Sequence, residues 1–254
     1  MAEAATFAGK SALITGAASG IGAACARLLA TQGAARLVLV DRDAEGLGTL
    51  DLACPCERVT GDVANEATWA ALEPKLAPLD LAVINAGIAS GAPIADLDFA
   101  EWRRILSVNL DGAFLALRAA MRNIADGGSV VLTSSVSGFK PEPGTAAYGA
   151  SKAAIIQLAK VAAKESAPRG IRVNAIAPGG VDTPIWDQTP FFRDLVAQHE
   201  GDRDAALAAM AKMATPLGRY ASADEVAAQI GFLLSDAALT ITGTVLVSDG
   251  GYSL

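Results

Sequence analysis

The 254-residue sequence has few of the residues from which many protein sites are built. It has one histidine, His199, which excludes a multi-histidine metal centre and is expected at the surface. The three cysteines do not indicate a disulfide framework, and Cys54-Pro55-Cys56 lacks the partner ligands of a zinc site. We expect Cys25 to be buried in a helix and the other two cysteines to belong to a strand. No metal site is predicted.

Long apolar runs and an excess of positive charge are also missing. No segment approaches the roughly 18–20 apolar residues that span a bilayer, and the first residues lack the pattern of a signal peptide. The net charge of −7 argues against a nucleic-acid or anionic-membrane surface, because counterion release needs clustered Lys and Arg. Hydrophobic residues make up 52% of the chain, which is enough for a substantial core. We therefore expect a soluble, cytoplasmic protein that binds neither nucleic acid nor membrane.

Short apolar segments alternate with longer helix-like segments along the chain. The runs Leu37–Val40 and Val130–Leu132 do not alternate with polar residues, which is typical of strands buried on both faces of a parallel sheet. The repeated strand–helix order predicts one doubly wound α/β domain over residues 1–254, with right-handed crossovers. The expected elements are strands at Ser11–Thr15, Arg36–Val40, Glu57–Thr60, Leu79–Asn85, Ser129–Thr133, Arg172–Ala177 and Thr244–Val247, and helices at Gly20–Gln32, Ala64–Leu76, Phe99–Ile124, Thr145–Ala167 and Ala223–Leu234.

Residues 184–216, called the lid segment below, interrupt this alternation. Prolines bound the segment, and its pattern predicts two short helices and no strand. It either covers a ligand as a lid or only packs on the surface of the domain. Its large apolar side chains either face a cleft, which would favour an apolar or cyclic substrate, or anchor the segment: Trp186, Phe191, Phe192, Met210 and Met213.

A glycine-rich turn follows the first expected strand, with the spacing Gly16-x-x-x-Gly20-x-Gly22. Glycines let backbone N–H groups approach a pyrophosphate, and a helix N-terminus favours its negative charge, although a tight strand–helix turn has the same pattern. Asp41 ends the second strand 19 residues beyond Gly22, the distance expected for a carboxylate that accepts from the adenosine ribose. This carboxylate would repel the 2′-phosphate of NADP. Arg42 could hold that phosphate instead, but the strand-end position of Asp41 favours NAD.

Tyr148 and Lys152 stand four residues apart on an expected helix, so both side chains lie on one helix face. A phenol has an ordinary pKa near 10, and a nearby ammonium favours the phenolate and lowers that pKa. The pair therefore suits general acid–base catalysis, although the same spacing also occurs on solvated helices without any function.

Taken together, these motifs resemble the short-chain dehydrogenase/reductase family, of the single-domain type with a Rossmann-type fold, over nearly the whole chain. Each motif is short, and their occurrence together in this order is specific. The matching motifs are Thr15-Gly16-x-x-x-Gly20-x-Gly22, Asp41, Asp62-Val63, Asn85-Ala86-Gly87, Val108-Asn109, Ser134-Ser135, Tyr148-x-x-x-Lys152, Pro178-Gly179 with Thr183, and Asp249-Gly250-Gly251.

The resemblance implies a role for each residue of a catalytic tetrad. Tyr148 corresponds to the acid–base residue, and Lys152 tunes it and holds the nicotinamide ribose. Ser135 matches the serine that orients the substrate, with its neighbour Ser134 as second choice. Asn109 matches the asparagine that supports a proton-relay water beside the lysine. The tetrad is complete in this sequence.

The same resemblance assigns a set of residues to the cofactor. Members of the family that prefer NADP often carry a basic residue just before the second loop glycine, where this chain has Ser19, which supports NAD. Thr183 resembles the position that contacts the nicotinamide amide. The implied cofactor residues are Gly16, Ser19, Gly20, Ile21, Gly22, Asp41, Arg42, Asp62, Val63, Asn85, Ala86, Gly87, Tyr148, Lys152, Pro178, Gly179, Val181 and Thr183.

The sequence thus predicts an NAD-dependent enzyme that interconverts a small secondary alcohol and a ketone by hydride transfer. Lys140 and Arg219 are the few cations expected near the pocket, which disfavours a strongly anionic substrate. Two alternatives are a β-ketoacyl thioester reductase using NADPH, which Asp41 disfavours, and a non-catalytic nucleotide-binding regulatory protein, which the complete tetrad disfavours. Relatives are commonly tetramers with contacts through Phe99–Ile124, Thr145–Ala167 and the C-terminal segment, so a homotetramer is expected.

Overall fold

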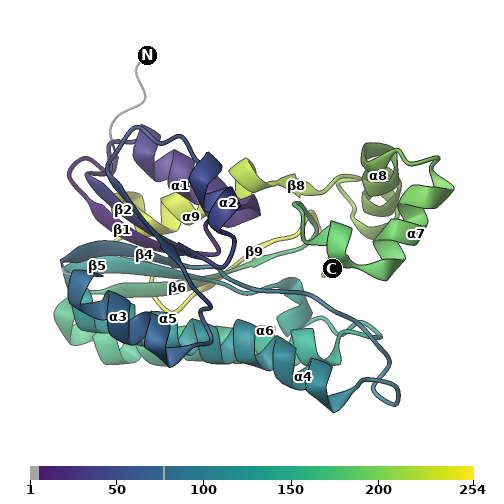
Figure 1. The fold of residues 1–254 in the computed structure, drawn as a ribbon, viewed down its shortest axis with the longest axis horizontal. Coiled ribbons are helices and arrows are strands. Elements are labelled where there is room, and N and C mark those ends of the chain that lie inside the picture. The colour runs from purple at the N-terminus through teal and green to yellow at the C-terminus, as the bar shows by residue number, and fades with distance from the viewer. Residues whose placement is uncertain (1–5, 77) are drawn as a thin grey trace.

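A central parallel sheet of seven strands organises the computed structural model, which describes residues 6–76 and 78–254 (Figure 1). Its strands are β1 (Ser11–Thr15), β2 (Arg36–Asp41), β3 (Cys56–Thr60), β4 (Leu79–Ile84), β5 (Ile124–Thr133), β6 (Arg172–Pro178) and β9 (Val245–Ser248). Their order in the sheet is β3-β2-β1-β4-β5-β6-β9. The order reverses between β1 and β4, and this switch point is where doubly wound sheets bind ligands.

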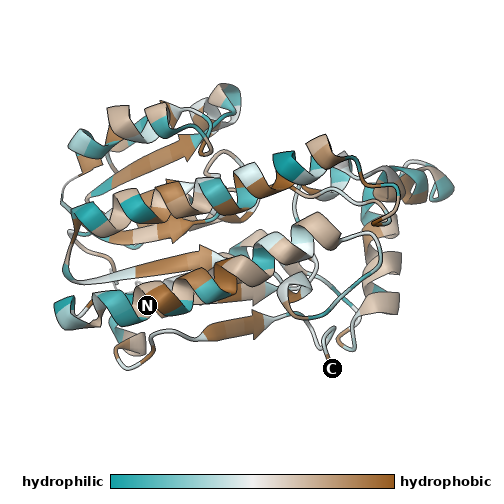
Figure 2. Ribbon diagram, turned by 90° about the horizontal axis from the view of Figure 1, so that it is seen from below, coloured by the Kyte–Doolittle hydropathy of each residue, from teal (hydrophilic) through white to brown (hydrophobic). Residues whose placement is uncertain are grey.

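Helices cover both faces of the sheet and bury two separate cores. Leu13 and Ile14 are neighbours on β1 and point into opposite cores, as the two-residue period of a strand requires. Figure 2 shows strands that are hydrophobic over most of their length and helices that carry both kinds of residue. The helices are α1 (Gly20–Thr31), α2 (Ala44–Thr49) and α9 (Ala223–Leu234) with one core, and α3 (Glu66–Leu76), α5 (Gly112–Asn123) and α6 (Ala146–Ser166) with the other.

The predicted fold class and the seven predicted strands are confirmed, while some helices differ from expectation. The expected helix Phe99–Ile124 is α4 (Phe99–Leu106), a π-helical turn at Ser107–Asp111, and α5. Helix α2 was not predicted because it has six residues and contains two glycines. Short 3₁₀ turns lie at Val136–Gly138 (η2), Ala167–Arg169 (η3) and Asp236–Ala238 (η5).

The three cysteines and the single histidine lie in different parts of the fold. Cys25 is buried in α1, as expected. Cys56 opens β3, but Cys54 lies before the strand, so the expectation that both belong to it is wrong for Cys54. His199 is the C-terminal cap of the first helix of the lid segment, Pro190–Gln198, and is partly exposed.

The lid segment forms the 3₁₀ turn η4 (Trp186–Gln188) and two helices, α7 (Pro190–Gln198) and α8 (Arg203–Ala214), and contains no strand, as predicted. Two short parallel strands, β7 (Val181–Asp182) before it and β8 (Ala221–Ser222) after it, pair with each other. The two ends of the lid segment are therefore held side by side, and its helices project beyond the carboxyl ends of the sheet strands (Figure 1). Within residues 6–76 and 78–254, no helix has the length and apolar composition needed to cross a membrane.

Candidate active site

The sequence motifs meet at the carboxyl edge of the sheet because all the main strands run parallel. Thr15 ends β1, and Asp41 ends β2. Asn85 follows β4 directly, and Pro178 ends β6. The structure thus brings segments far apart in the sequence to one edge, the location at which open α/β sheets bind their ligands.

The glycine-rich turn between β1 and α1 leaves no room for a side chain at Gly16 or Gly22. A Cβ atom on Gly22 would lie 2.0 Å from the carbonyl oxygen of Gly16, and one on Gly16 would lie 2.8 Å from Cα of Ala86. Gly16 and Gly20 have φ angles of +66° and +52°, which glycine adopts without strain. The N–H groups of the first turn of α1 have no partners within the helix. This loop therefore fits the pyrophosphate of a dinucleotide.

Asp41 braces the glycine-rich turn. Its carboxylate accepts hydrogen bonds from the backbone N–H of Ala18 at 2.9 Å and from that of Asp43 at 3.0 Å. Arg42, between the two aspartates, is exposed. The carboxylate is thus fixed beside the glycine-rich turn.

The segments after β3 and β4 complete the predicted cofactor edge. Asp62 is exposed and accepts from Ala64 N–H, while Val63 is buried and its carbonyl accepts from the Trp69 indole at 2.8 Å. The N–H groups of Asn85 and Ala86 donate to the Thr15 hydroxyl at 2.9 Å and 3.1 Å. Thr15 therefore ties the end of β1 to the end of β4, on either side of the switch point.

Gly87 lies against two members of the predicted tetrad. A Cβ atom at this position would be 3.4 Å from Oδ1 of Asn109 and 3.4 Å from Nζ of Lys152. The loop after β4 is thus packed directly on these two polar groups.

Asn109 lies in the π-helical turn between α4 and α5 and is almost completely buried. Its amide group accepts from Ile88 N–H at 2.8 Å and donates to the Ile88 carbonyl at 2.9 Å and to the Ser151 hydroxyl at 3.2 Å. π-Helical turns are rare in proteins, and those that occur are often found at functional sites. The role of Ser151 as a partner was not predicted, because only the tertiary fold brings it to Asn109.

Lys152 lies on α6 with its ammonium group 5.6 Å from the centre of the Tyr148 ring. The group donates to the Thr133 carbonyl at 2.9 Å, and burial lowers the pKa of Lys152 to about 8. Burial also raises the pKa of Tyr148, while a hydrogen bond with Ser135 acts in the opposite direction. The sequence predicted a lowered pKa for this phenol. The difference arises because desolvation outweighs the stabilising contacts.

The two candidate serines have different surroundings. The Ser134 hydroxyl donates to the backbone carbonyl of Lys152 at 2.8 Å, so it fastens β5 to α6. The Ser135 hydroxyl accepts from Ser137 N–H at 3.2 Å and also meets the phenol of Tyr148. Of the two, Ser135 is therefore the one placed to share a substrate oxygen with the tyrosine.

The segment after β6 returns to the glycine-rich turn. Gly180 has no space for a side chain because the Tyr220 ring would lie 2.3 Å from its Cβ atom. Val181 and Thr183 are buried, and Gly179 N–H donates to the Ser248 carbonyl at 2.9 Å. The Thr183 methyl group lies 3.2 Å from the position of a Cβ atom on Gly20. The residue that follows β7 and the start of α1 are thus in contact.

The apolar side chains of the lid segment fall into two groups. Trp186 stacks on Tyr220 with ring centroids 5.8 Å apart and packs against the buried Phe192, while its indole donates to the Val181 carbonyl. Met210 belongs to the same small core. These residues anchor the segment, whereas Phe191 and Met213 are exposed.

The two cations expected near the pocket have partners. Lys140 donates to the Tyr252 carbonyl at 2.6 Å and lies over the Tyr252 ring, and Arg219 forms an ion pair with Glu225 at 2.7 Å. Among residues 6–76 and 78–254, no three His, Cys, Asp or Glu side chains are grouped to hold a metal ion. The Tyr148 phenol, the Ser135 hydroxyl and the Lys152 ammonium at this edge are groups that suit proton transfer.

Comparisons with known proteins agree with this geometry. The family model described as enoyl-(acyl carrier protein) reductase matches residues 16–253. The chain is 42% identical to a cis-4-hydroxycyclohexanecarboxylate dehydrogenase of Sinomonas cyclohexanicum, over 97% of this chain and 98% of that protein. It is 39% identical to a D-threitol dehydrogenase of Mycolicibacterium smegmatis, over 97% of this chain and 94% of that protein.

A solved structure shares the fold over the same length. The L-sorbose reductase of Gluconobacter frateurii, complexed with NADPH and L-sorbose, superposes with a TM-score of 0.89 at 29% identity. The match covers 98% of each chain. The likeness therefore extends over the sheet, the helices and the lid segment together.

Proposed function

This chain belongs to the short-chain dehydrogenase/reductase family of oxidoreductases, and on that premise we propose that it interconverts a secondary alcohol and a ketone with NAD. The observation that carries the proposal is the meeting of Tyr148, Ser135 and Lys152 at the edge that also holds the glycine-rich turn. A proton donor and a site fitted to a dinucleotide are the two parts that hydride transfer to a carbonyl needs.

In the proposed mechanism the nicotinamide, when bound, supplies or accepts the hydride. Tyr148 donates its phenolic proton to the carbonyl oxygen in reduction and accepts the hydroxyl proton of the alcohol in oxidation. The Ser135 hydroxyl forms a hydrogen bond with the same substrate oxygen. The positive charge of Lys152 favours the tyrosinate that reduction leaves behind. Asn109 fixes the Ile88 backbone beside Lys152 and would support a water that returns protons from solvent.

The proposed preference for NAD rests on Asp41. Its carboxylate is held at the end of β2 by two backbone N–H groups, so it cannot turn away from a 2′-phosphate without losing both hydrogen bonds. Ser19 leaves the turn without a basic side chain that would bind this phosphate. The family match leaves the choice of cofactor open, because the L-sorbose reductase is complexed with NADPH.

We propose a small, uncharged secondary alcohol, carried on a ring or an apolar chain, as the substrate. Phe191 and Met213 leave apolar surface on the lid segment, and Lys140 and Arg219 are already paired. A β-ketoacyl thioester is the second candidate, because the chain is also 37% identical to a 3-oxoacyl-[acyl-carrier-protein] reductase of Thermotoga maritima. The relatives act on a hydroxycyclohexane carboxylate and on D-threitol, by their names, so both ring and polyol alcohols belong in a test.

The test follows NADH formation over a panel of aliphatic, cyclic, benzylic, steroid and polyol alcohols, and NADPH oxidation with a β-ketoacyl thioester. Tyr148→Phe should lower turnover at least about 10²-fold, the scale of general acid–base catalysis, while NADH still binds. Tyr252→Phe, which removes a phenol outside the tetrad, should stay within about tenfold of wild type. A Tyr148→Phe enzyme as active as that control would contradict the assignment. Binding of NADH without turnover of any substrate would favour the regulatory alternative.

We further propose that residues 184–216 act as a substrate lid and that the protein is a homotetramer. Phe99, Phe114 and Val161 are exposed on α4, α5 and α6, where an interface would cover them. Light scattering on the purified protein would give the number of chains. The cytoplasmic location expected from the sequence stays a prediction.

A further inference from the structure

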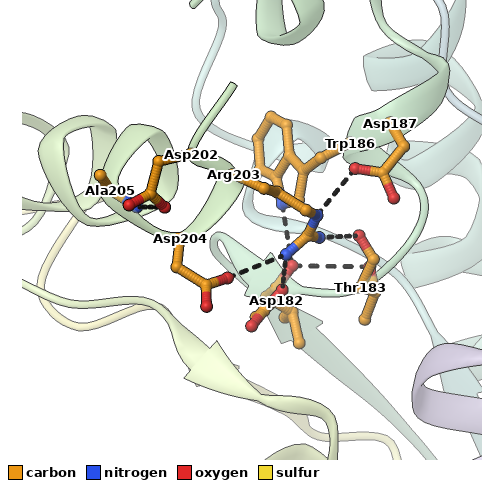
Figure 3. A network of polar contacts seen from close by, with 9 residues as sticks. Asp182, Thr183, Trp186, Asp187, Asp202, Arg203, Asp204 and Ala205 are labelled. Atoms are coloured by element: carbon orange, nitrogen blue, oxygen red, sulfur yellow. Dashed lines mark hydrogen bonds and ion pairs between the residues drawn. The ribbon is translucent and has the colours of Figure 1, made fainter. Parts of the chain in front are cut away.

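Arg203, the first residue of α8, lies at the centre of a network of polar contacts in the lid segment (Figure 3). Its guanidinium forms ion pairs with Asp187 at 2.9 Å and with Asp182 at 2.8 Å. It also donates to the backbone carbonyl of Thr183 at 3.3 Å and lies 5.7 Å from the centre of the Phe192 ring. The neighbouring Asp204 is a fifth partner, with its carboxylate 3.8 Å from the guanidinium. One side chain thus contacts five residues of the lid segment and its base.

These partners come from different parts of the chain. Asp182 belongs to β7, before the lid segment, and pairs in register with Ser222 of β8, after it. Asp187 lies in η4, and Phe192 is a buried residue of α7. Arg203 therefore fastens the middle of the lid segment to the two-stranded base that joins its ends.

Thr183 connects this network to the cofactor edge. Its carbonyl accepts from Arg203, while its methyl group lies 3.2 Å from the position of a Cβ atom on Gly20. Thr183 is buried, so it has little freedom to adjust if either neighbour moves. A displacement of α8 would consequently move Thr183 and, through it, the glycine-rich turn that fits a pyrophosphate.

The charges of the network would also affect the binding of an anionic cofactor. Asp182 directly precedes Thr183, which contacts the glycine-rich turn, and Asp187 follows four residues later in η4, so both carboxylates belong to the segment next to this turn. Arg203 is the cation between them, and each of the two carboxylates raises the pKa of its guanidinium. Without this cation, the carboxylates would repel the phosphates of the cofactor.

We propose that Arg203 is a positioning residue for the cofactor: it holds the lid segment against Thr183 and neutralises Asp182 and Asp187, and so raises the affinity for a nicotinamide dinucleotide. This inference rests on the proposed function, since it assigns the cofactor to the same edge. No assignment from the sequence motifs includes Arg203, because its partners are brought together only by the fold.

The test compares Arg203→Gln with Arg169→Gln. Arg169 is a matched control because its guanidinium also combines an ion pair, to Asp126 at 2.8 Å, with bonds to two backbone carbonyls, and it follows α6 at the opposite edge of the sheet. The Kd values for NADH and NADPH are measured by fluorescence. Cleavage by chymotrypsin at the exposed Phe191 is followed with and without NADH.

Arg203→Gln should raise the Kd of the preferred cofactor about tenfold, the scale of two lost ion pairs in one network, and should speed cleavage at Phe191. Arg203→Lys keeps the charge but not the fork geometry, so it should restore part of the affinity. Arg169→Gln should leave the Kd unchanged. A Kd and a cleavage rate of Arg203→Gln that equal those of wild type would overturn the inference alone, as would an equal loss of affinity in Arg169→Gln. A wild-type protein that binds neither cofactor would overturn the proposed function together with it.

Discussion

The side-chain amide of Asn109 and the peptide groups of Ile88 form a closed pair of hydrogen bonds, with the Ile88 N–H donating at 2.8 Å and its carbonyl accepting at 2.9 Å. The pair joins the π-helical turn to the loop after β4, and both residues are buried. Asn109 thus holds the part of this loop around Ile88, as Thr15 holds the part at Asn85 and Ala86.

Asn109→Ala should destabilise the protein by about 1–3 kcal/mol and lower turnover, because it leaves two buried peptide groups of Ile88 unpaired. The free energy of unfolding is measured by urea denaturation, and turnover by NADH formation. Asn123→Ala is the matched control, since Asn123 makes one bond, to the Ala119 carbonyl at the end of α5. Asn123→Ala should lower the free energy of unfolding by less than about 1 kcal/mol and leave turnover unchanged. Equal effects of the two substitutions would show that the Ile88 pair is unimportant.

Lys152→Met should stabilise the protein at pH 7 while abolishing turnover. Burial lowers the pKa of Lys152 from 10.5 to about 8, so the folded state disfavours the ammonium. From this shift, the free energy of unfolding should rise by at most about 3 kcal/mol in Lys152→Met. The loss of the hydrogen bond to the Thr133 carbonyl makes the increase smaller.

The pH dependence of this gain follows from the sign of the shift. Below pH 8 the lysine is charged in both states, and the cost of burying the charge is complete. Between pH 8 and 10.5 the unfolded state binds the extra proton, so the stability of the wild type rises with pH and the advantage of Lys152→Met shrinks. Lys164→Met changes an exposed lysine of the same helix and should not stabilise the protein at pH 7, because no buried group is replaced. A constant difference between wild type and Lys152→Met from pH 7 to 10.5 would refute the assigned shift.

Asp41→Ser should raise kcat/KM for NADP at least about tenfold, because it removes a carboxylate that repels the 2′-phosphate. The value for NAD should fall, since a serine cannot brace both Ala18 and Asp43. Asp43→Ser is the control: Asp43 caps α2 by accepting from Gly46 N–H, and a serine can also cap a helix. If Asp41→Ser and Asp43→Ser show the same ratio of NAD to NADP activity, Asp41 does not set the preference.

Gly22→Ala should destabilise the protein by about 1–3 kcal/mol and weaken NADH binding, because its Cβ atom would lie 2.0 Å from the Gly16 carbonyl oxygen. Gly48→Ala is the control on a helix with open space around the new methyl group. It should stabilise the protein by about 0.5–1 kcal/mol. Thermal denaturation measures the stability of both variants, and titration measures their affinity for NADH. Unimpaired NADH binding by Gly22→Ala would mean that the turn is not the pyrophosphate site.

The sequence by itself determined the parallel sheet, the glycine-rich turn and the shared helix face of Tyr148 and Lys152. Each of these depends on residues close together in the chain: uninterrupted apolar runs predict strands buried on both faces, and a four-residue spacing aligns two side chains on a helix. Because parallel strands end at one edge, the order of the strands also placed the motifs of distant segments near one another.

Only the tertiary structure decided the surroundings of these residues. The π-helical turn at Asn109, the different partners of Ser134 and Ser135, the raised pKa of Tyr148 and the contacts of Arg203 with Asp182 and Thr183 all depend on segments that meet after folding. Burial and long-range hydrogen bonds fix these properties, and neither can be read from the spacing of residues along the chain.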